Sequence, residues 1–193
     1  MNKSNLGLNH IAKSLKQTVH GLIYLYILTI PFQTLGLRFM ELEFGPPELV
    51  FLVLAPLAII HIIHSQKKFW IDKLDLFVFG WILANILAGW FAGFDLIVIT
   101  QIIKTAYLVV LYMILKWTIS PKMLTRIVKT LILSSLIAAL TGIMGFGLGY
   151  FGIDTTLSIT RPFPYSIENV IQAKGFTPTP NMLASIIMIG VLF

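Results

Sequence analysis

A lysine inside a long apolar stretch is the residue of this sequence with the clearest chemical consequence. Lys104 lies about nine residues into the apolar run 95–117, where a cation within a bilayer costs roughly 2.5–3.5 kcal/mol on insertion scales. Three polar residues lie three or four positions away and share its helix face: Thr100, Gln101 and Tyr107. This stripe would suit an anionic head group that enters from the outer leaflet. It is equally explained by a structural lysine that snorkels or bonds to Asn85.

Two further cations and an asparagine form a second candidate group. Arg161 and Lys174 would clamp a phosphate, because cations and backbone amides bind phosphate oxygens well. They are also explained as ordinary solvated loop charges. Asn181 follows Pro180 and would cap the next helix through its side-chain oxygen. In a second interpretation, the start of that helix faces an anionic ligand.

The remaining motifs do not indicate nucleotide or metal chemistry. The stretch "GFGLGYFG" at 145–152 has the look of a glycine-rich nucleotide loop, but it follows a helical run and not a strand. Its glycines continue the spacing of Ala138 and Gly142, which indicates a closely packed helix face. His61 and His64 have no accompanying carboxylates, and the chain contains no cysteine. We therefore expect neither a metal nor a cofactor.

The amino-acid composition indicates whether the segments that contain these residues lie in water or in lipid. Of the 193 residues, 57% are hydrophobic and 11% are charged, whereas soluble domains have about 25% charged residues. The mean hydropathy is +0.88. A soluble core of this size cannot bury so much apolar surface, so we expect the chain to lie in a lipid bilayer. The net charge of +6 does not indicate nucleic acid, because the cations cluster between apolar runs.

Five apolar runs are long enough to cross a bilayer, which takes about 20 helical residues. They are 19–37, 48–64, 74–92, 95–117 and 126–151. A sixth begins at Asn181 and extends over 13 residues, or about 20 Å, against a hydrocarbon core of about 30 Å. We predict an all-α integral membrane protein with five complete transmembrane helices plus the start of a sixth. We also expect the sequence to be the N-terminal part of a longer protein.

Lysines and arginines are distributed unequally on the two sides of these runs. Ten lie on the side of the N-terminus: Lys3, Lys13, Lys16, Lys67, Lys68, Lys73, Lys116, Lys122, Arg126 and Lys129. Three lie on the opposite side: Arg38, Arg161 and Lys174. This asymmetry predicts a cytoplasmic N-terminus. The expected order is a cytoplasmic segment 1–18, a transmembrane bundle 19–151, an ordered extracytoplasmic loop 152–180 and the start of the sixth helix 181–193.

The end of the loop provides the one resemblance to a known family. The stretch "KGFTPTPNMLAS", residues 174–185, resembles the segment that opens the shared core region of the O-antigen ligase and polymerase family of bacterial membrane proteins. There, an outer loop runs into a helix through Gly-Phe, then Pro-Asn and small or apolar residues. The matching residues are Gly175, Phe176, Pro180, Asn181, Leu183 and Ala184. Family members often carry arginine before the glycine, where this chain has Lys174, which lacks the bidentate fork of arginine.

The resemblance implies a glycosyltransferase of the bacterial cytoplasmic (inner) membrane. Such an enzyme moves a glycan from a polyprenyl-diphosphate carrier to a lipid or glycan acceptor at the outer face, in the biosynthesis of cell-surface polysaccharide or lipopolysaccharide. The candidate diphosphate-binding residues would be Lys104, Arg161, Lys174 and Asn181. The family's catalytic histidine lies in a large outer loop that would follow Phe193. We therefore expect no catalytic residue within residues 1–193, and no transferase activity from them alone.

Two other functions stay open at this point. A polytopic transporter or flippase would also use a lysine within a span and helices kinked by proline, although no internal repeat is visible in the sequence. A non-catalytic membrane partner is the third possibility. All three have the lipid bilayer as a partner, and none requires nucleic acid.

Overall fold

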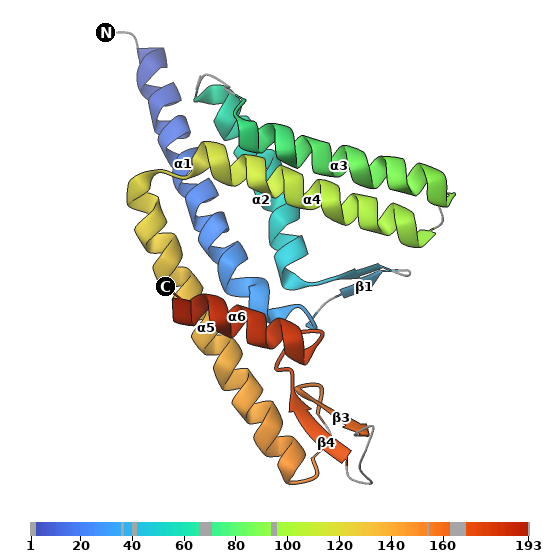
Figure 1. Ribbon diagram of the computed structural model, residues 1–193. Coiled ribbons are helices and arrows are strands. Elements are labelled where there is room, and N and C mark those ends of the chain that lie inside the picture. Colours follow the sequence, from blue (N-terminus) through green and yellow to red (C-terminus); the bar gives the residue numbers. More distant parts are fainter. Residues whose placement is uncertain are drawn as a thin grey trace. The chain divides into compact units, whose positions relative to one another are not determined.

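The computed structural model describes most of the chain (Figure 1). The described residues are 3–35, 37–39, 42–65, 71–93, 96–153, 155–162 and 169–192. Lys67 and Lys68, two of the cations used to predict the orientation, lie outside this set.

Helices make up most of the described chain. They are α1 (Lys3–Thr29), the 3-10 helix η1 (Ile30–Phe32), α2 (Pro46–His64), α3 (Lys73–Ala92), α4 (Leu96–Thr118), α5 (Pro121–Tyr150) and α6 (Pro180–Leu192). The strands are β1 (Leu37–Phe39), β2 (Leu42–Phe44), β3 (Ser158–Pro162) and β4 (Asn169–Ala173). They form two antiparallel pairs, β1–β2 and β3–β4. The chain is predominantly helical, as predicted, but the all-α prediction missed these two hairpins.

Four helices of the described chain are long and apolar enough to cross a membrane: α2, α3, α4 and α5. They closely match the four runs predicted between residues 48 and 151. The fifth span, predicted over 19–37, is not confirmed. Its helix ends at Thr29 and a 3-10 turn containing Pro31 follows, because proline lacks the N–H that would continue the α-helical ladder. The apolar helix α6 has 13 residues.

The chain divides into two compact units. The first unit comprises residues 1–16 and 55–119, and the second comprises residues 17–54 and 120–193. In the first unit, α3 and α4 lie side by side as a helical hairpin (Figure 1). A capping box begins α3, in which Asp72 and Asp75 each accept the other's backbone N–H, at 3.0 and 2.8 Å. The helix ends at Gly93 in the left-handed region, with φ of 91°.

The second unit is assembled on α5, against which α6 and the β3–β4 hairpin pack (Figure 1). The buried face of α5 consists largely of small residues: Ser134, Ser135, Ala138, Gly142 and Gly145. The Ser134 hydroxyl donates to the Ile27 carbonyl of α1 at 2.9 Å. The Ser135 hydroxyl donates to the Ile186 carbonyl of α6 at 2.8 Å. Both bonds join the side chain of one helix to the backbone of another, which requires close approach.

The glycines of α5 explain how the neighbouring segments come so near. A methyl group on Gly142 would lie 2.7 Å from Cδ2 of Leu183 in α6. One on Gly145 would overlap the carbonyl group of Leu157, which precedes β3. The prediction that these small residues form a close-packing face is therefore confirmed, and the face receives a strand hairpin as well as a helix.

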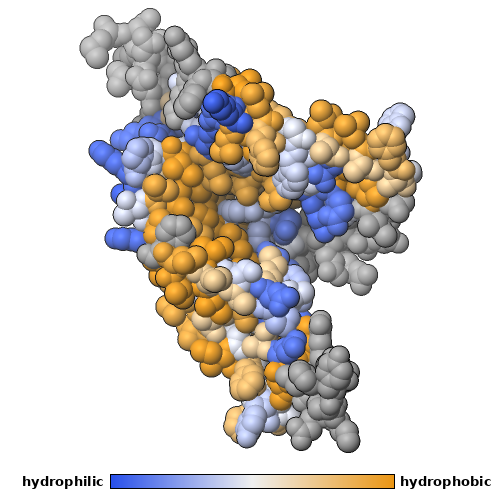
Figure 2. Space-filling view, viewed as in Figure 1, coloured by the Kyte–Doolittle hydropathy of each residue, from blue (hydrophilic) through white to orange (hydrophobic). Residues whose placement is uncertain are grey.

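Large apolar side chains are exposed on the outward faces of the helices. Phe77 and Phe91 of α3 are 74% and 87% exposed, and Ile143 of α5 is 69% exposed. Figure 2 shows that hydrophobic side chains cover much of the visible face. Surfaces of this extent are avoided in water and are ordinary in lipid. The fold is that of a multi-pass membrane protein.

Two glycines in the same helix test this packing. We expect Gly145→Ala to destabilise the protein by about 1–3 kcal/mol, because its methyl group overlaps Leu157. Gly147→Ala should be neutral or stabilising by up to about 1 kcal/mol, because no neighbouring atom lies within 4 Å and alanine has the higher helix propensity. Thermal unfolding in detergent measures both. Equal effects of the two substitutions would contradict the packing described here.

Candidate functional site

The residues that carry the family resemblance form a tight turn between β4 and α6, residues 174–179. Gly175 has φ of 56°, a conformation that side chains other than glycine rarely adopt. A methyl group there would lie 2.7 Å from Oγ1 of Thr141 in α5. The N–H groups of Lys174 and Gly175 both donate to the Leu157 carbonyl, at 3.0 and 2.9 Å. Glycine at this position therefore has a physical reason within the fold.

Phe176 and Thr177, the next two residues, hold the 174–179 turn in place. The Phe176 carbonyl accepts hydrogen bonds from the backbone N–H and the hydroxyl of Thr34, each at 2.9 Å. The rings of Phe176 and Phe32 lie 5.8 Å apart. Thr177 is fully buried, and its hydroxyl lies within hydrogen-bond distance of the carbonyls of Lys174 and Thr179. The turn is thus bonded internally and to the segment that follows α1.

The start of α6 differs from the prediction in one residue. Thr179 caps the helix: its hydroxyl oxygen accepts the Met182 N–H at 3.3 Å, and its carbonyl accepts the Leu183 N–H at 3.2 Å. The interpretation of Asn181 as the cap is therefore wrong. The helix begins one residue earlier, with Pro180 at its first position, where proline's missing N–H costs nothing. Asn181 is exposed in the first turn, so its side chain is not used as a cap.

The two predicted loop cations lie on the same hairpin but are not adjacent. Lys174 follows β4 directly and is half-buried; its side chain has no hydrogen bond or ion pair with the described residues. Arg161 is paired with Val170, and only its backbone is described. Lys174 lies four positions after Val170, or about 13 Å along an extended chain. A phosphate clamp would therefore need both long side chains to reach toward one another.

An apolar groove lies beside this turn, bounded by α5, β4 and α6. Its volume is about 350 Å³, and apolar atoms form almost all of its lining. Ala139 and Phe146 of α5, Ala173 of β4 and Leu183 of α6 are among the lining residues. A groove of this size and character is suited to a hydrocarbon chain.

Lys104 belongs to the first unit, whereas the other three predicted site residues belong to the second. Its side chain is exposed on α4, as is that of Gln101. Asn85, the structural partner considered from the sequence, donates to the Trp81 carbonyl of its own helix at 2.8 Å. Within the described chain, Lys104 forms no ion pair or hydrogen bond through its side chain. Lys174 lies in the 174–179 turn, and Asn181 lies in the first turn of α6, which follows that turn. Lys104 lies in the other unit.

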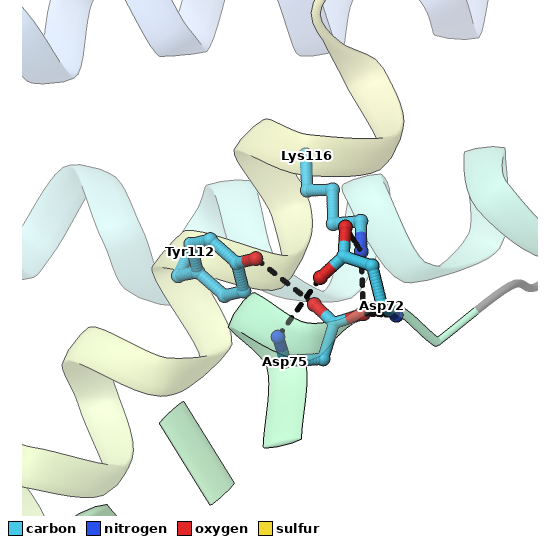
Figure 3. A network of polar contacts seen from close by, with 4 residues as sticks. All are labelled: Asp72, Asp75, Tyr112 and Lys116. Atoms are coloured by element: carbon cyan, nitrogen blue, oxygen red, sulfur yellow. Dashed lines mark hydrogen bonds and ion pairs between the residues drawn. The ribbon is translucent and has the colours of Figure 1, made fainter. Parts of the chain in front are cut away.

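An ion cluster in the first unit was missed by the sequence analysis (Figure 3). The Lys116 ammonium donates to Asp72 at 2.9 Å and also to Asp75. The Tyr112 hydroxyl donates to the other oxygen of Asp75 at 2.9 Å. The side chains of Asp75 and Lys116 are 1% and 13% exposed, and that of Asp72 is 35% exposed. The cluster joins the first turn of α3 to the last turns of α4.

The buried charged groups of the cluster have hydrogen-bond partners within it. Asp75 accepts from an ammonium, a phenol and a backbone N–H, and such bonds offset the cost of burying a carboxylate. The hydrogen bond from Lys116, followed by the one from the Asp75 N–H, holds the pKa of the Asp72 carboxyl below its ordinary value. The described residues contain no group of three metal-ligand side chains. The arrangement is therefore a structural lock between two helices.

A sequence signal for this lock existed. Asp72 and Asp75 have capping-box spacing before an apolar run, and Tyr112 and Lys116 lie four residues apart on one helix face.

Comparison with known proteins found no matching protein-family model, and neither a curated protein nor a solved structure that matches the chain significantly. The resemblance of residues 174–185 therefore stays a prediction from the sequence.

Two lysines of α4 provide a matched test of the lock. Lys116→Met should lower the melting temperature by several degrees, because two neighbouring carboxylates, one of them buried, lose their counter-charge. Lys104→Met should leave it nearly unchanged, since Lys104 is exposed and its side chain has no partner in the described chain. Thermal unfolding of both variants in one detergent decides the matter. A Lys116→Met protein as stable as the parent would show that the cluster contributes little.

Proposed function

We propose that this chain is the N-terminal membrane portion of a glycan ligase or polymerase of the O-antigen ligase type. The intact enzyme would transfer a polyprenyl-diphosphate-linked glycan to a lipid or glycan acceptor at the outer face of the bacterial cytoplasmic membrane. In this proposal the N-terminus is cytoplasmic, α1 contributes a fifth span, and α6 begins a sixth.

The observation that supports this proposal most is the form of the segment that carries the resemblance. Gly175 fits its turn only as glycine, Phe176 anchors the turn to Thr34, and Pro180 opens an apolar helix. A rigid turn that delivers the chain into a helix is a suitable frame for a lipid-linked substrate, because it holds polar groups at a fixed depth.

The chemistry that these residues would perform is binding and not bond cleavage. A diphosphate is a good leaving group, so the protein has mainly to position it and neutralise its charge. Lys174, with Arg161 and Asn181 nearby in sequence, would supply that charge and hydrogen bonding at the outer face. The apolar groove beside α6 would hold part of the polyprenyl tail. Lys104 would act as a second cation toward the diphosphate.

The proposed orientation has a direct test. Reporter fusions after Ser65 and after Thr155 should report the cytoplasm and the extracytoplasmic side, respectively, because α3, α4 and α5 are three membrane crossings between them. Alkaline phosphatase and a cytoplasm-active fluorescent protein provide complementary readouts. Phosphatase activity at Ser65, or its absence at Thr155, would reverse the orientation and remove Lys174 from the outer face.

The proposed binding role is tested on the full-length protein encoded by the gene. With a purified polyprenyl-diphosphate-linked glycan and its acceptor, Lys174→Ala should lower kcat/KM about 10- to 100-fold, since a charge-assisted contact is lost. Lys174→Arg should retain most activity. Lys104→Ala should raise the donor KM, because we propose Lys104 as a second cation toward the diphosphate.

Lys13→Ala is the control, since Lys13 is an exposed cation on α1, and we expect it to behave like the parent. Unchanged turnover and donor affinity in both Lys104→Ala and Lys174→Ala would remove these residues from the site. Translocation of a labelled lipid without glycan transfer would replace the proposal by a transporter or flippase.

A further inference from the structure

The first third of α5 presents three cations on one exposed face. Lys122, Arg126 and Lys129 are all exposed, and at 3.6 residues per turn they lie within an arc of about 60°. A different face of the same turns is buried through Met123 and Ile127, which are 3% and 7% exposed. The helix is therefore held by one side and directs its charges outward from the other.

No side chain of the described residues neutralises these charges. None of the three cations forms an ion pair or a side-chain hydrogen bond within the described part of the chain. The first turn of α5 also contains no acidic residue, although a helix is stabilised by acidic rather than basic residues there. Neither an ion pair within the described chain nor the helix dipole therefore explains a lysine at position 122.

The length of α5 sets the depth of these cations in a bilayer. The helix has 30 residues, or about 45 Å, against a hydrocarbon core of about 30 Å. The apolar part from Leu131 to Tyr150 is sufficient to cross that core. The turns from Pro121 to Thr130, which contain all three cations, then extend through the layer of lipid headgroups.

The same face of α5 continues as an apolar surface. Leu133, Leu136 and Leu140 follow the cations, and all six residues lie within an arc of about 80°; the leucines are 49%, 55% and 54% exposed. Figure 2 shows hydrophilic side chains gathered over the first turns of α5 and hydrophobic ones along the part that follows. Cations followed by exposed leucines match a lipid molecule, with its phosphate at the cations and its chains along the leucines.

We propose that this face of α5, formed by Lys122, Arg126, Lys129 and the leucines that follow, binds the phosphate headgroup and chains of an anionic phospholipid. The positive-inside rule alone needs cations near the membrane, and it does not require them on one face above a lipid-exposed surface. Basic clusters at a membrane surface attract anionic lipids by a large factor per cation. The site is independent of the glycan-transfer proposal, since it uses none of the same residues.

The test uses the full chain, delipidated in detergent and titrated with phosphatidylglycerol by native mass spectrometry. The variant Lys122→Gln/Arg126→Gln/Lys129→Gln should bind phosphatidylglycerol about 10- to 100-fold more weakly than the parent. The control Lys13→Gln/Lys16→Gln/Lys73→Gln removes the same charge from three other exposed lysines and should keep the parent affinity. The charge-conserving variant Lys122→Arg/Lys129→Arg should also keep it, and it serves if the glutamine variant fails to fold.

Three results would overturn the proposal. Equal losses in the two glutamine variants would mean a general charge effect without a site. Unchanged affinity in the α5 variant would remove the face from lipid binding. Equal binding of phosphatidylcholine, or displacement by inorganic phosphate at concentrations comparable to those of the lipid, would mean that the lipid headgroup and chains are not jointly recognised.

Raising the salt concentration from 50 to about 500 mM should weaken phosphatidylglycerol binding in the parent.

Discussion

In a bilayer, an apolar helix gains little by leaving lipid for another apolar helix, so helix contacts depend on close approach and hydrogen bonds. The second unit is built on this constraint. From Ser134 to Gly145 the buried residues of α5 are serine, alanine and glycine, and groups of neighbouring segments lie almost against Gly142 and Gly145. Ser134 and Ser135 then reach carbonyls in two other helices. Replacing this face by larger apolar residues would remove both kinds of contact at once.

The 174–179 turn depends on the same closeness. Gly175 lies against Thr141 and Gly142 of α5, and the Leu157 carbonyl is shared by two N–H donors of the turn. Because the turn is anchored to α5 and to the residues after α1, the depth of Lys174 is set by the packing of the bundle and not by the loop itself. A cation placed in this way is suited to a ligand of fixed depth, such as a lipid phosphate.

The charges of the helices differ in how they are compensated. Asp75 and Lys116 are buried and neutralise one another across two helices. Lys122, Arg126 and Lys129 extend into the headgroup layer, where lipid supplies the opposite charge. Lys104 is exposed in a membrane-spanning helix without a side-chain partner in the described chain. A charge within a bilayer must be compensated. The compensation of the Lys104 charge therefore depends on what this exposed face of α4 contacts in the membrane.

The sequence by itself determined four helices: α2, α3, α4 and α5 follow from runs of about 20 apolar residues. A helix satisfies its backbone hydrogen bonds within the segment, so such a run can form one in lipid without a partner. It also determined the small-residue face of α5, since the spacing is local. It did not determine the end of α1 at Thr29 or the β3–β4 hairpin, whose strands are too short and mixed for a periodic signal. The pairing of Asp75 with Lys116 and the cap at Thr179 were decided only by the tertiary structure. The ion pair joins residues 41 positions apart, and such a separation carries no periodicity that reveals it. The cap depends on where the 174–179 turn, which is bonded to Thr34 and Leu157, passes into α6.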